Sequence, residues 1–477
     1  MSNQNASKMW SGRFREPLNA TFEQWQRSFP FDWRLLPQEI AASSAHARAI
    51  AAAGILTDAE LKQMLDGLAA VAARFPASGD LQQTGAAIVA SSPGAEDIHH
   101  FSELELHKEI GDLALKLHTG RSRNEQIATD MRLFVRDAID NTLAGLREWI
   151  AALIEIAEAA QDAVMPSYTH LQRAEPVLIA HWLLAYVSMA ERDCTRMADC
   201  RKRMNLCPLG SGAIAGATLA LDRTIAASAL GFDAPTPNSM DATSDRDFAL
   251  EFTSAASILG IHISRFAEEL TLHSTAEFGF LDLPEAFSTG SSAMPQKKNP
   301  DLTELIRGKS GRLLGANVTL SVLIKGLPLA YNKDLQEGQE PVFDVADTLA
   351  GMFSVLPAFT RALRFREDRM KVAADTGYLN AMAAATYLTH KGVPFRKAHE
   401  KIGNAVRFGL ESGRELGELT LGELQEFGPE FGEDFFASVT LEATLDCHDV
   451  IGGTARHRVA EAVQAAKQRL SLSSNEE

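Results

Sequence analysis

The sequence has few of the residues that crosslink a protein, bind nucleic acid or anchor a protein in a membrane. Its 477 residues contain four cysteines with no Cys-x2-Cys pair, so we expect reduced thiols and no structural zinc site. Acidic residues outnumber basic ones, and the net charge of -16 argues against a nucleic-acid or anionic membrane surface. Residues 1–8 lack the apolar core of a signal peptide, and no run of about 18 apolar residues suggests a membrane span. These absences predict a soluble, cytoplasmic protein.

Alternating strand patterns are also scarce, whereas apolar residues recur at spacings of three and four. Long helices are predicted at 140–164, 176–203, 248–275 and 302–324, and shorter ones at 36–53 and 58–73. These segments are rich in alanine and leucine on several faces, so they need partners on several sides, as in a helical bundle or an oligomer core. We therefore expect an all-α protein with a central bundle of long helices.

Breaks in this pattern divide the chain into three regions. Residues 1–120 hold shorter helical segments, residues 121–369 hold the long helices, and residues 370–477 form a smaller helical tail with glycine-bearing loops. We expect an N-terminal helical domain, a central domain built from the long-helix bundle, and a small C-terminal helical domain with these bounds.

The segment 290–300, GSSAMPQKKNP, combines two hydroxyls, two ammonium groups and two carboxamides in a short loop. Removing a proton from a carbon beside a carboxylate creates a doubly charged aci-carboxylate, which preorganised cations and donors stabilise. Lys297 and Asn299 suit that role, and a serine can act as the base if its alkoxide is stabilised. Asn299, Pro300 and Asp301 also match a helix start, with Asn299 as the N-cap. The alternative, in which the lysines are only solvated and Asn299 only caps, fits each residue alone but not the ordered string.

Four segments together resemble the argininosuccinate lyase family of the fumarase/aspartase superfamily. They are the loop 290–300, the arginine-rich turn 119–126 (TGRSRNEQ), the segment 166–172 (PSYTHLQ) and the segment 331–337 (YNKDLQE). The resemblance covers nearly the full chain and implies a homotetramer whose central helices associate, with each active site assembled from three chains. It also implies reversible cleavage of argininosuccinate to arginine and fumarate, without a cofactor, in arginine synthesis.

The resemblance assigns roles to individual residues. Ser291 would be the general base that removes the Cβ proton, and Lys297 with Asn299 would stabilise the aci-carboxylate. His170, oriented by Glu304, would protonate the departing guanidinium nitrogen, directly or through water. The other substrate-binding residues would be Ser28, Asp97, Arg123, Asn124, Thr169, Tyr331 and Gln336.

Three further features bear on this interpretation. Gln339 stands where the family usually has lysine, which removes a cation from the substrate end. The glycine-rich stretch 208–216 lacks the Lys-Ser/Thr ending of a nucleotide loop, so we expect it to serve close backbone approach. An acidic and histidine-rich stretch could suggest a metal site; it comprises Glu96, Asp97, His99, His100, Glu103 and His107. No His-Glu-x-x-His motif occurs, and a lysine can supply the positive charge that the chemistry needs, so we expect no metal.

Two alternatives stay open. One is another succinyl-compound lyase, such as adenylosuccinate lyase, which should also bind AMP. The other is a non-catalytic structural relative, which would make no demand for Ser291, His170, Lys297 and Glu304 together.

Overall fold

The structure, a computed structural model, describes residues 16–76 and 80–473. The polar start at residues 1–8, on which the expected lack of a signal peptide rests, lies outside the described residues. The chain forms two compact units. The first unit takes Met1–Ile139, Asp199–Phe252 and Ala316–Asp344, and the second takes Asp140–Ala198, Thr253–Gly315 and Val345–Glu477. The three regions expected from the sequence, 1–120, 121–369 and 370–477, stay a prediction.

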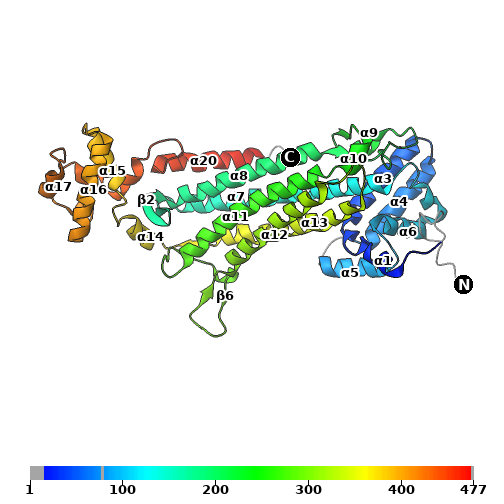
Figure 1. Ribbon diagram of the computed structural model, residues 1–477, viewed down its shortest axis with the longest axis horizontal. Helices are drawn as coiled ribbons and strands as arrows, with labels where there is room; N and C mark the ends of the chain where they lie inside the picture. The colour runs from blue at the N-terminus through cyan, green and yellow to red at the C-terminus, as the bar shows by residue number, and fades with distance from the viewer. Residues whose placement is uncertain (1–15, 77–79, 474–477) are drawn as a thin grey trace. The chain divides into compact units, whose positions relative to one another are not determined.

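The described residues are mostly helical, as the sequence predicts (Figure 1). The elements confined to the first unit are α1 (Ala20–Trp25), α2 (Phe29–Asp32), α3 (Leu36–Ala52), α4 (Asp58–Arg74), α5 (Leu81–Ser91), α6 (Ile98–Ile110), β3 (Leu206–Cys207), α9 (Arg223–Ala229), β4 (Ala234–Pro235) and α10 (Ser239–Ser244), with 3-10 turns at Trp33–Leu35, Gly111–Lys116 and Lys333–Gly338. Five longer helices have segments in both units: α7 (Arg123–Ala159), α8 (Ile179–Met204), α11 (Asp247–Ser274), α12 (Asp301–Ile324) and α13 (Gln339–Arg361).

The second unit holds the remaining elements. They are β1 (Val164–Thr169), β2 (Gln172–Leu178), β5 (Leu281–Asp282), β6 (Thr289–Gly290), β7 (Lys298–Asn299), β8 (Arg364–Phe365), α14 (Glu367–Ala374), α15 (Ala381–His390), α16 (Phe395–Ser412), α17 (Leu421–Phe427), α18 (Phe435–Ser438), α19 (Leu441–Asp446) and α20 (Arg456–Ser473), with 3-10 turns at Glu285–Phe287 and Leu416–Glu418. The strands form two-stranded pairs, of which β3–β4 is parallel and the others are antiparallel.

Two of the predicted helices need correction. The segment predicted at 140–164 is the second half of α7, which begins at Arg123 and ends at Ala159. The segment predicted at 176–203 begins only at Ile179, because the residues before it form the β1–β2 hairpin. Alternation was hard to see there because the buried and exposed positions of β1 do not alternate and a register shift follows Pro166. The helices predicted at 36–53, 58–73, 248–275 and 302–324 are confirmed as α3, α4, α11 and α12.

In the first unit, α3, α4 and α6 pack against one another (Figure 1). Their shared core includes Ile50, Met64 and Leu106, all fully buried. Gly67 permits this packing, since a Cβ there would lie 2.9 Å from the Leu106 side chain. The start of α4 is set by a capping box between Thr57 and Glu60. This core packs α6 against α3 and α4.

In the second unit, aromatic side chains join the long helices. Trp149 of α7 packs edge-on to Phe266 of α11 at 5.6 Å between ring centroids, and Trp182 of α8 stacks on the same ring at 6.1 Å. Residues 384–439 have a separate hydrophobic core around Leu388, Phe431 and Phe435. Such rings and apolar side chains form the core of this unit.

One segment, Lys333–Arg361, is long and apolar enough to cross a membrane by length and composition. Core helices of soluble proteins pass the same test. More than half of its apolar window is buried inside the protein, with Val342, Val345 and Leu349 fully buried. Burial in the protein therefore accounts for its hydropathy.

Candidate active site

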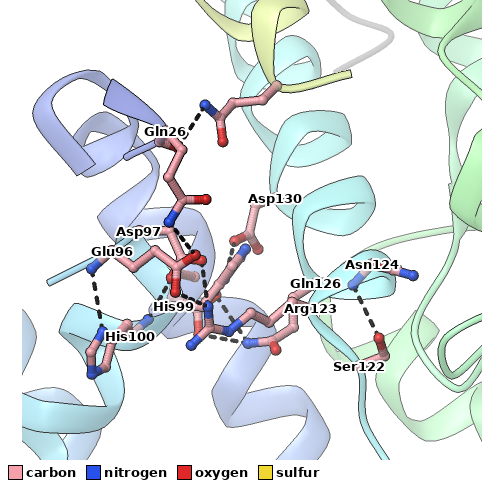
Figure 2. Close-up of polar contacts among 12 residues, drawn as sticks. Gln26, Glu96, Asp97, His99, His100, Ser122, Arg123, Asn124, Gln126 and Asp130 are labelled. Carbon is pink, nitrogen blue, oxygen red and sulfur yellow. Dashed lines mark hydrogen bonds and ion pairs between the residues drawn. The ribbon is translucent and has the colours of Figure 1, made fainter. Parts of the chain in front are cut away.

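Asp97 and Arg123 form the centre of the site residues in the first unit (Figure 2). Asp97 is the N-cap of α6, where its Oδ1 accepts the backbone N–H of His100 at 2.8 Å. Its Oδ2 accepts a hydrogen bond of 2.8 Å from Arg123, the first residue of α7. Arg123 also contacts Glu96, which accepts a bond of 3.1 Å from the Gln26 side chain. The starts of two helices therefore meet at one partly buried ion pair.

Ser28 lies beside this pair and is almost fully buried. Its backbone N–H donates to the Glu96 carbonyl at 3.1 Å, and its hydroxyl contacts Asp32. Burial raises the pKa of Asp32 to about 7, and the nearby Asp97 charge adds to the effect. Sequence reasoning missed Asp32 because it sits in an apolar stretch without a motif.

Asn124 is anchored by the glycine-rich stretch 208–216. Its side-chain amide donates to the Ala213 carbonyl at 3.1 Å, while the neighbouring Glu125 accepts the Gly212 N–H at 3.0 Å. Gly212 has a φ of +60°, and a Cβ there would lie 2.6 Å from the Gly216 carbonyl oxygen. Close backbone approach, expected for this stretch, is therefore used to hold the first turn of α7.

Tyr331 and Gln336 come from the segment before α13. Gln336 is buried and donates to the Gln26 carbonyl at 3.2 Å. Burial raises the pKa of Tyr331; Arg246 opposes this shift, and the charges of Asp97 and neighbouring carboxylates reinforce it. Six predicted substrate-binding residues thus gather in the first unit: Ser28, Asp97, Arg123, Asn124, Tyr331 and Gln336.

Arg246 is a second residue that sequence reasoning missed. It is nearly fully buried, and burial lowers its pKa to about 10. It lines a small cavity with Gln339, whose side-chain oxygen has no hydrogen-bond partner among the described residues. A lysine at 339 would put a second buried cation beside Arg246, so the neutral glutamine avoids that repulsion.

In the second unit, Thr169 and His170 lie in the exposed turn of the β1–β2 hairpin. Thr169 pairs with Gln172, so His170 and Leu171 form a two-residue turn. Both have positive φ, +54° and +57°, which glycine and asparagine adopt far more readily. The hairpin therefore holds an imidazole at its tip at a cost in backbone strain, which points to a functional demand.

Ser291 begins the exposed loop between β6 and β7. Its hydroxyl oxygen accepts the backbone N–H groups of Ala293 at 3.2 Å and Met294 at 3.1 Å. Two N–H donors aimed at one hydroxyl oxygen stabilise the alkoxide that a serine base requires. No local sequence pattern indicates these two donors.

Lys297, Asn299 and Glu304 lie at the end of the same loop and in the first turn of α12. Asn299 is not the N-cap, since it pairs with Thr289 in β7 and the Pro300 carbonyl accepts the first helical bond, from Glu304 at 3.1 Å. Among the described residues Glu304 has an ion-pair contact with Arg307, at 3.9 Å, and no hydrogen bond to His170. The expected pairing of Glu304 with His170 stays a prediction.

The two groups of residues offer complementary chemistry. The first unit supplies a guanidinium, a carboxylate, amides and a phenol, which recognise the charged and polar ends of a small molecule. The second supplies a stabilised hydroxyl, an exposed ammonium and an imidazole, the groups needed to move protons and stabilise negative charge.

Comparison with known proteins identifies the family. A profile of the lyase family matches residues 12–315, and one described as the argininosuccinate lyase C-terminal region matches residues 378–446. The chain is 61% identical to the argininosuccinate lyase of Acidobacterium capsulatum, covering 97% of this chain and 94% of the relative. It is 47% identical to that of Pseudomonas aeruginosa, covering 99% and 100%.

Solved structures agree on the fold. An EDDS lyase variant with bound fumarate has a TM-score of 0.79 at 25% identity, covering 94% of this chain and 90% of that one. A class II fumarase from Schistosoma mansoni has a TM-score of 0.72 at 14% identity, covering 86% and 91%. The chain therefore belongs to the argininosuccinate lyase family, a family of lyases in the fumarase/aspartase superfamily.

Proposed function

We propose that the protein catalyses the reversible β-elimination of argininosuccinate to L-arginine and fumarate, in the cytoplasm and in arginine biosynthesis. The observation that carries this proposal is the near full-length similarity to relatives named argininosuccinate lyase, at 61% and 56% identity. No cofactor or metal enters the proposed reaction, since Lys297 supplies the positive charge.

In the proposed reaction, Ser291 removes a proton from the succinyl Cβ. The two N–H groups on its oxygen stabilise the alkoxide that takes the proton. The electron pair passes to the adjacent carboxylate as an aci-carboxylate, which Lys297 and Asn299 stabilise. Collapse of this intermediate breaks the C–N bond and forms the double bond of fumarate.

The leaving guanidinium nitrogen receives a proton from His170, directly or through water. Glu304 orients the imidazole and favours its charged form. Thr169 contacts the substrate beside it. Recognition of the remaining substrate falls to Arg123 and Asn124 at a carboxylate and to the other first-unit residues named above.

We also propose that the active site is completed in a homotetramer, with residues from three chains. Support comes from α12, where Leu314, Val318 and Val322 are exposed at every fourth position. Beside them, Gly308 and Gly311 are exposed, and a Cβ on either would meet nothing within 4 Å. An apolar stripe with small residues suits close packing of α12 against a helix of another copy.

The first test is turnover of argininosuccinate, followed through the ultraviolet absorbance of fumarate. Turnover of argininosuccinate but not of adenylosuccinate supports the proposal. Turnover of adenylosuccinate, with binding of AMP, would instead favour the related succinyl lyase. A folded protein inactive on both, and on aspartate and malate, would favour the non-catalytic alternative.

The variant Ser291→Ala tests the proposal that Ser291 is the general base. We expect turnover to fall by at least about a thousandfold while fold and assembly stay intact, because only the proton-accepting oxygen is removed. Ser292→Ala, the neighbouring serine, is the matched control and should keep most activity. Equal losses in the two variants would reject the assignment.

A further inference from the structure

A buried polar cluster lies beneath the Asp97–Arg123 pair, and its centre is Glu39 of α3. Glu39 is 1% exposed, and its Oε2 lies 2.6 Å from Nδ1 of His99. Its Oε1 accepts bonds from the Ser43 hydroxyl at 2.7 Å and the Gln126 side-chain amide at 3.2 Å. All of these groups are buried.

Two partners of Glu39 lie close in sequence to Asp97 and Arg123. His99 follows Asp97 by two residues in the first turn of α6, and Gln126 follows Arg123 by three residues in the first turn of α7. The Glu39 carboxylate on α3 therefore contacts both of the helix turns that carry the Asp97–Arg123 pair. Figure 2 shows His99 and Gln126 in the same group of side chains as Asp97 and Arg123. Arg123, His99, Gln126 and Glu39 also line one small hollow.

The same cluster contains the donor atoms of a possible metal site. A carboxylate oxygen of Glu39, a carboxylate oxygen of Asp130 and a ring nitrogen of His99 all lie within 4.8 Å of one another. Two donors to one tetrahedral zinc ion lie about 3.3 Å apart. The Glu39–His99 separation of 2.6 Å is too short for that and suits a shared proton. Arg121, which acts electrostatically on both carboxyl groups, also disfavours a cation here.

The charges of the cluster follow from its contacts. Burial opposes charge on His99, but the Glu39 carboxylate outweighs it and raises the pKa of the imidazole. Burial likewise opposes charge on Glu39, but His99 lowers the pKa of that carboxyl group. Asp130 has no hydrogen-bond donor among the described residues, and burial together with Glu39 raises its pKa well above the usual range. The neutral form of the Asp130 carboxyl group is therefore favoured, which leaves Glu39 as the charged partner of His99.

We propose that Glu39 is a positioning residue, which fixes Asp97 and Arg123 relative to each other through His99 on α6 and Gln126 on α7. The inference deepens the proposed function, on which it rests, by adding a residue that acts on substrate binding without touching the substrate. Asp97 and Arg123 belong to recognition, while the proton-transfer groups lie in the second unit. Loss of Glu39 should therefore weaken binding more than it slows the chemical step.

The test compares Glu39→Gln with Glu105→Gln. Glu105 is an equally buried carboxylate on α6, but it pairs with Arg74 at 3.0 Å and with Lys108. We expect E39Q to raise KM for argininosuccinate about tenfold or more with a much smaller change in kcat, because misplacement costs binding first. E105Q should lose similar thermal stability without a change in KM. An unchanged KM in folded E39Q, or an equal rise in both variants, would overturn the proposal.

A second readout does not depend on activity. In ¹⁵N-histidine NMR, the His99 signal, assigned by His99→Asn, should be that of an imidazolium at pH 7 and should become neutral in E39Q. A neutral His99 in the unmodified protein would overturn the proposal. Charged and titratable groups surround His99 from every packed element: Glu39 on α3, Asp130 and Arg123 on α7, Asp32 on α2, Asp97 and Glu103 on its own helix, and Arg121 and His118 in the loop before α7.

The two readouts separate this proposal from the function itself. If the unmodified protein cleaves no argininosuccinate, the proposed function fails, while the NMR comparison still decides whether Glu39 holds His99 charged. If E39Q does not fold, H99N replaces it in the kinetic comparison, because it keeps a donor near Glu39 and removes the charge. H99N should give the same selective rise in KM, and its absence would count against the proposal.

Discussion

At the scale of single residues, Asp97 does two separable things. Its Oδ1 caps α6, and its Oδ2 binds Arg123. Asparagine caps helices as well as aspartate but carries no charge, so the two roles can be divided by substitution.

We expect Asp97→Asn to raise KM about tenfold at nearly unchanged stability, because Arg123 loses one carboxylate partner but keeps Glu96, while the cap survives. Asp97→Ala should show the same kinetic defect and lose about 1 kcal/mol more of unfolding free energy. Chemical denaturation and steady-state kinetics measure the two effects. Equal stability of the two variants would show that the cap contributes little.

The raised pKa of Asp32 predicts that the free energy of unfolding depends on pH. Its folded pKa of about 7 lies above the unfolded value, so the folded state binds more protons than the unfolded state between roughly pH 4 and pH 7. Stability from this group is therefore greatest at low pH and is lost as the pH rises towards 7, at up to about 1.4 kcal/mol per pH unit. Asp32→Asn should remove this loss and stabilise the protein more at pH 8 than at pH 5, as thermal unfolding at both values would reveal. A gain of the same size at both pH values would contradict the assigned shift.

At the scale of elements, the β1–β2 hairpin combines an exposed turn with unfavourable backbone angles. Leu171 is 68% exposed, so its side chain adds little burial to offset the strain of a φ of +57°. His170 shares the strain but carries an imidazole that the proposed reaction uses.

Leu171→Gly should therefore stabilise the protein by about 0.5–1 kcal/mol, because glycine adopts positive φ without a Cβ clash. Leu171→Ala serves as the control and should bring no gain, since alanine keeps the Cβ. Denaturant midpoints of the three proteins measure the difference. A gain in the alanine variant as well would mean that loss of the exposed leucine, rather than relief of strain, is responsible.

At the scale of the whole molecule, the exposed apolar stripe of α12 has no partner helix within the described part of the chain. Val318 is 60% exposed in the middle of it. If the proposed tetramer forms through this stripe, we expect Val318→Glu to lower the molecular mass measured by light scattering from that of a tetramer to that of smaller species, because charges do not bury in an apolar interface. Leu410→Glu on α16, at a residue 65% exposed, should leave the mass unchanged.

If each active site is assembled from several chains, as proposed, two inactive variants should complement each other. If His170 and Ser291 of one site come from different chains, mixing His170→Asn with Ser291→Ala under conditions that exchange subunits should restore part of the activity that each variant lacks. The fumarate assay measures this recovery. Persistent inactivity after proven exchange would place both residues in one chain's site.

The helical class, the helices α3, α4, α11 and α12, and the family can all be predicted from the sequence, because apolar spacing and ordered motifs are local properties of the chain. The sequence did not show the β1–β2 hairpin, whose burial lacks alternation, or the true start of α7. Asn299 was misread as a cap because helix starts are local patterns that a neighbouring strand can override, and β7 ends there.

The way in which distant groups act on one another depends on the tertiary structure. That structure joined Ser28 to Asp32, paired Asp97 with Arg123, put two N–H groups on the Ser291 oxygen and set Glu39 under the starts of α6 and α7. The charge states of Asp32, Asp130 and His99 arise from burial and from neighbours far away in sequence, so no local pattern encodes them. The candidate substrate-binding residues can be recognised by motif, whereas the residues that hold them in place are identified only when the helices pack.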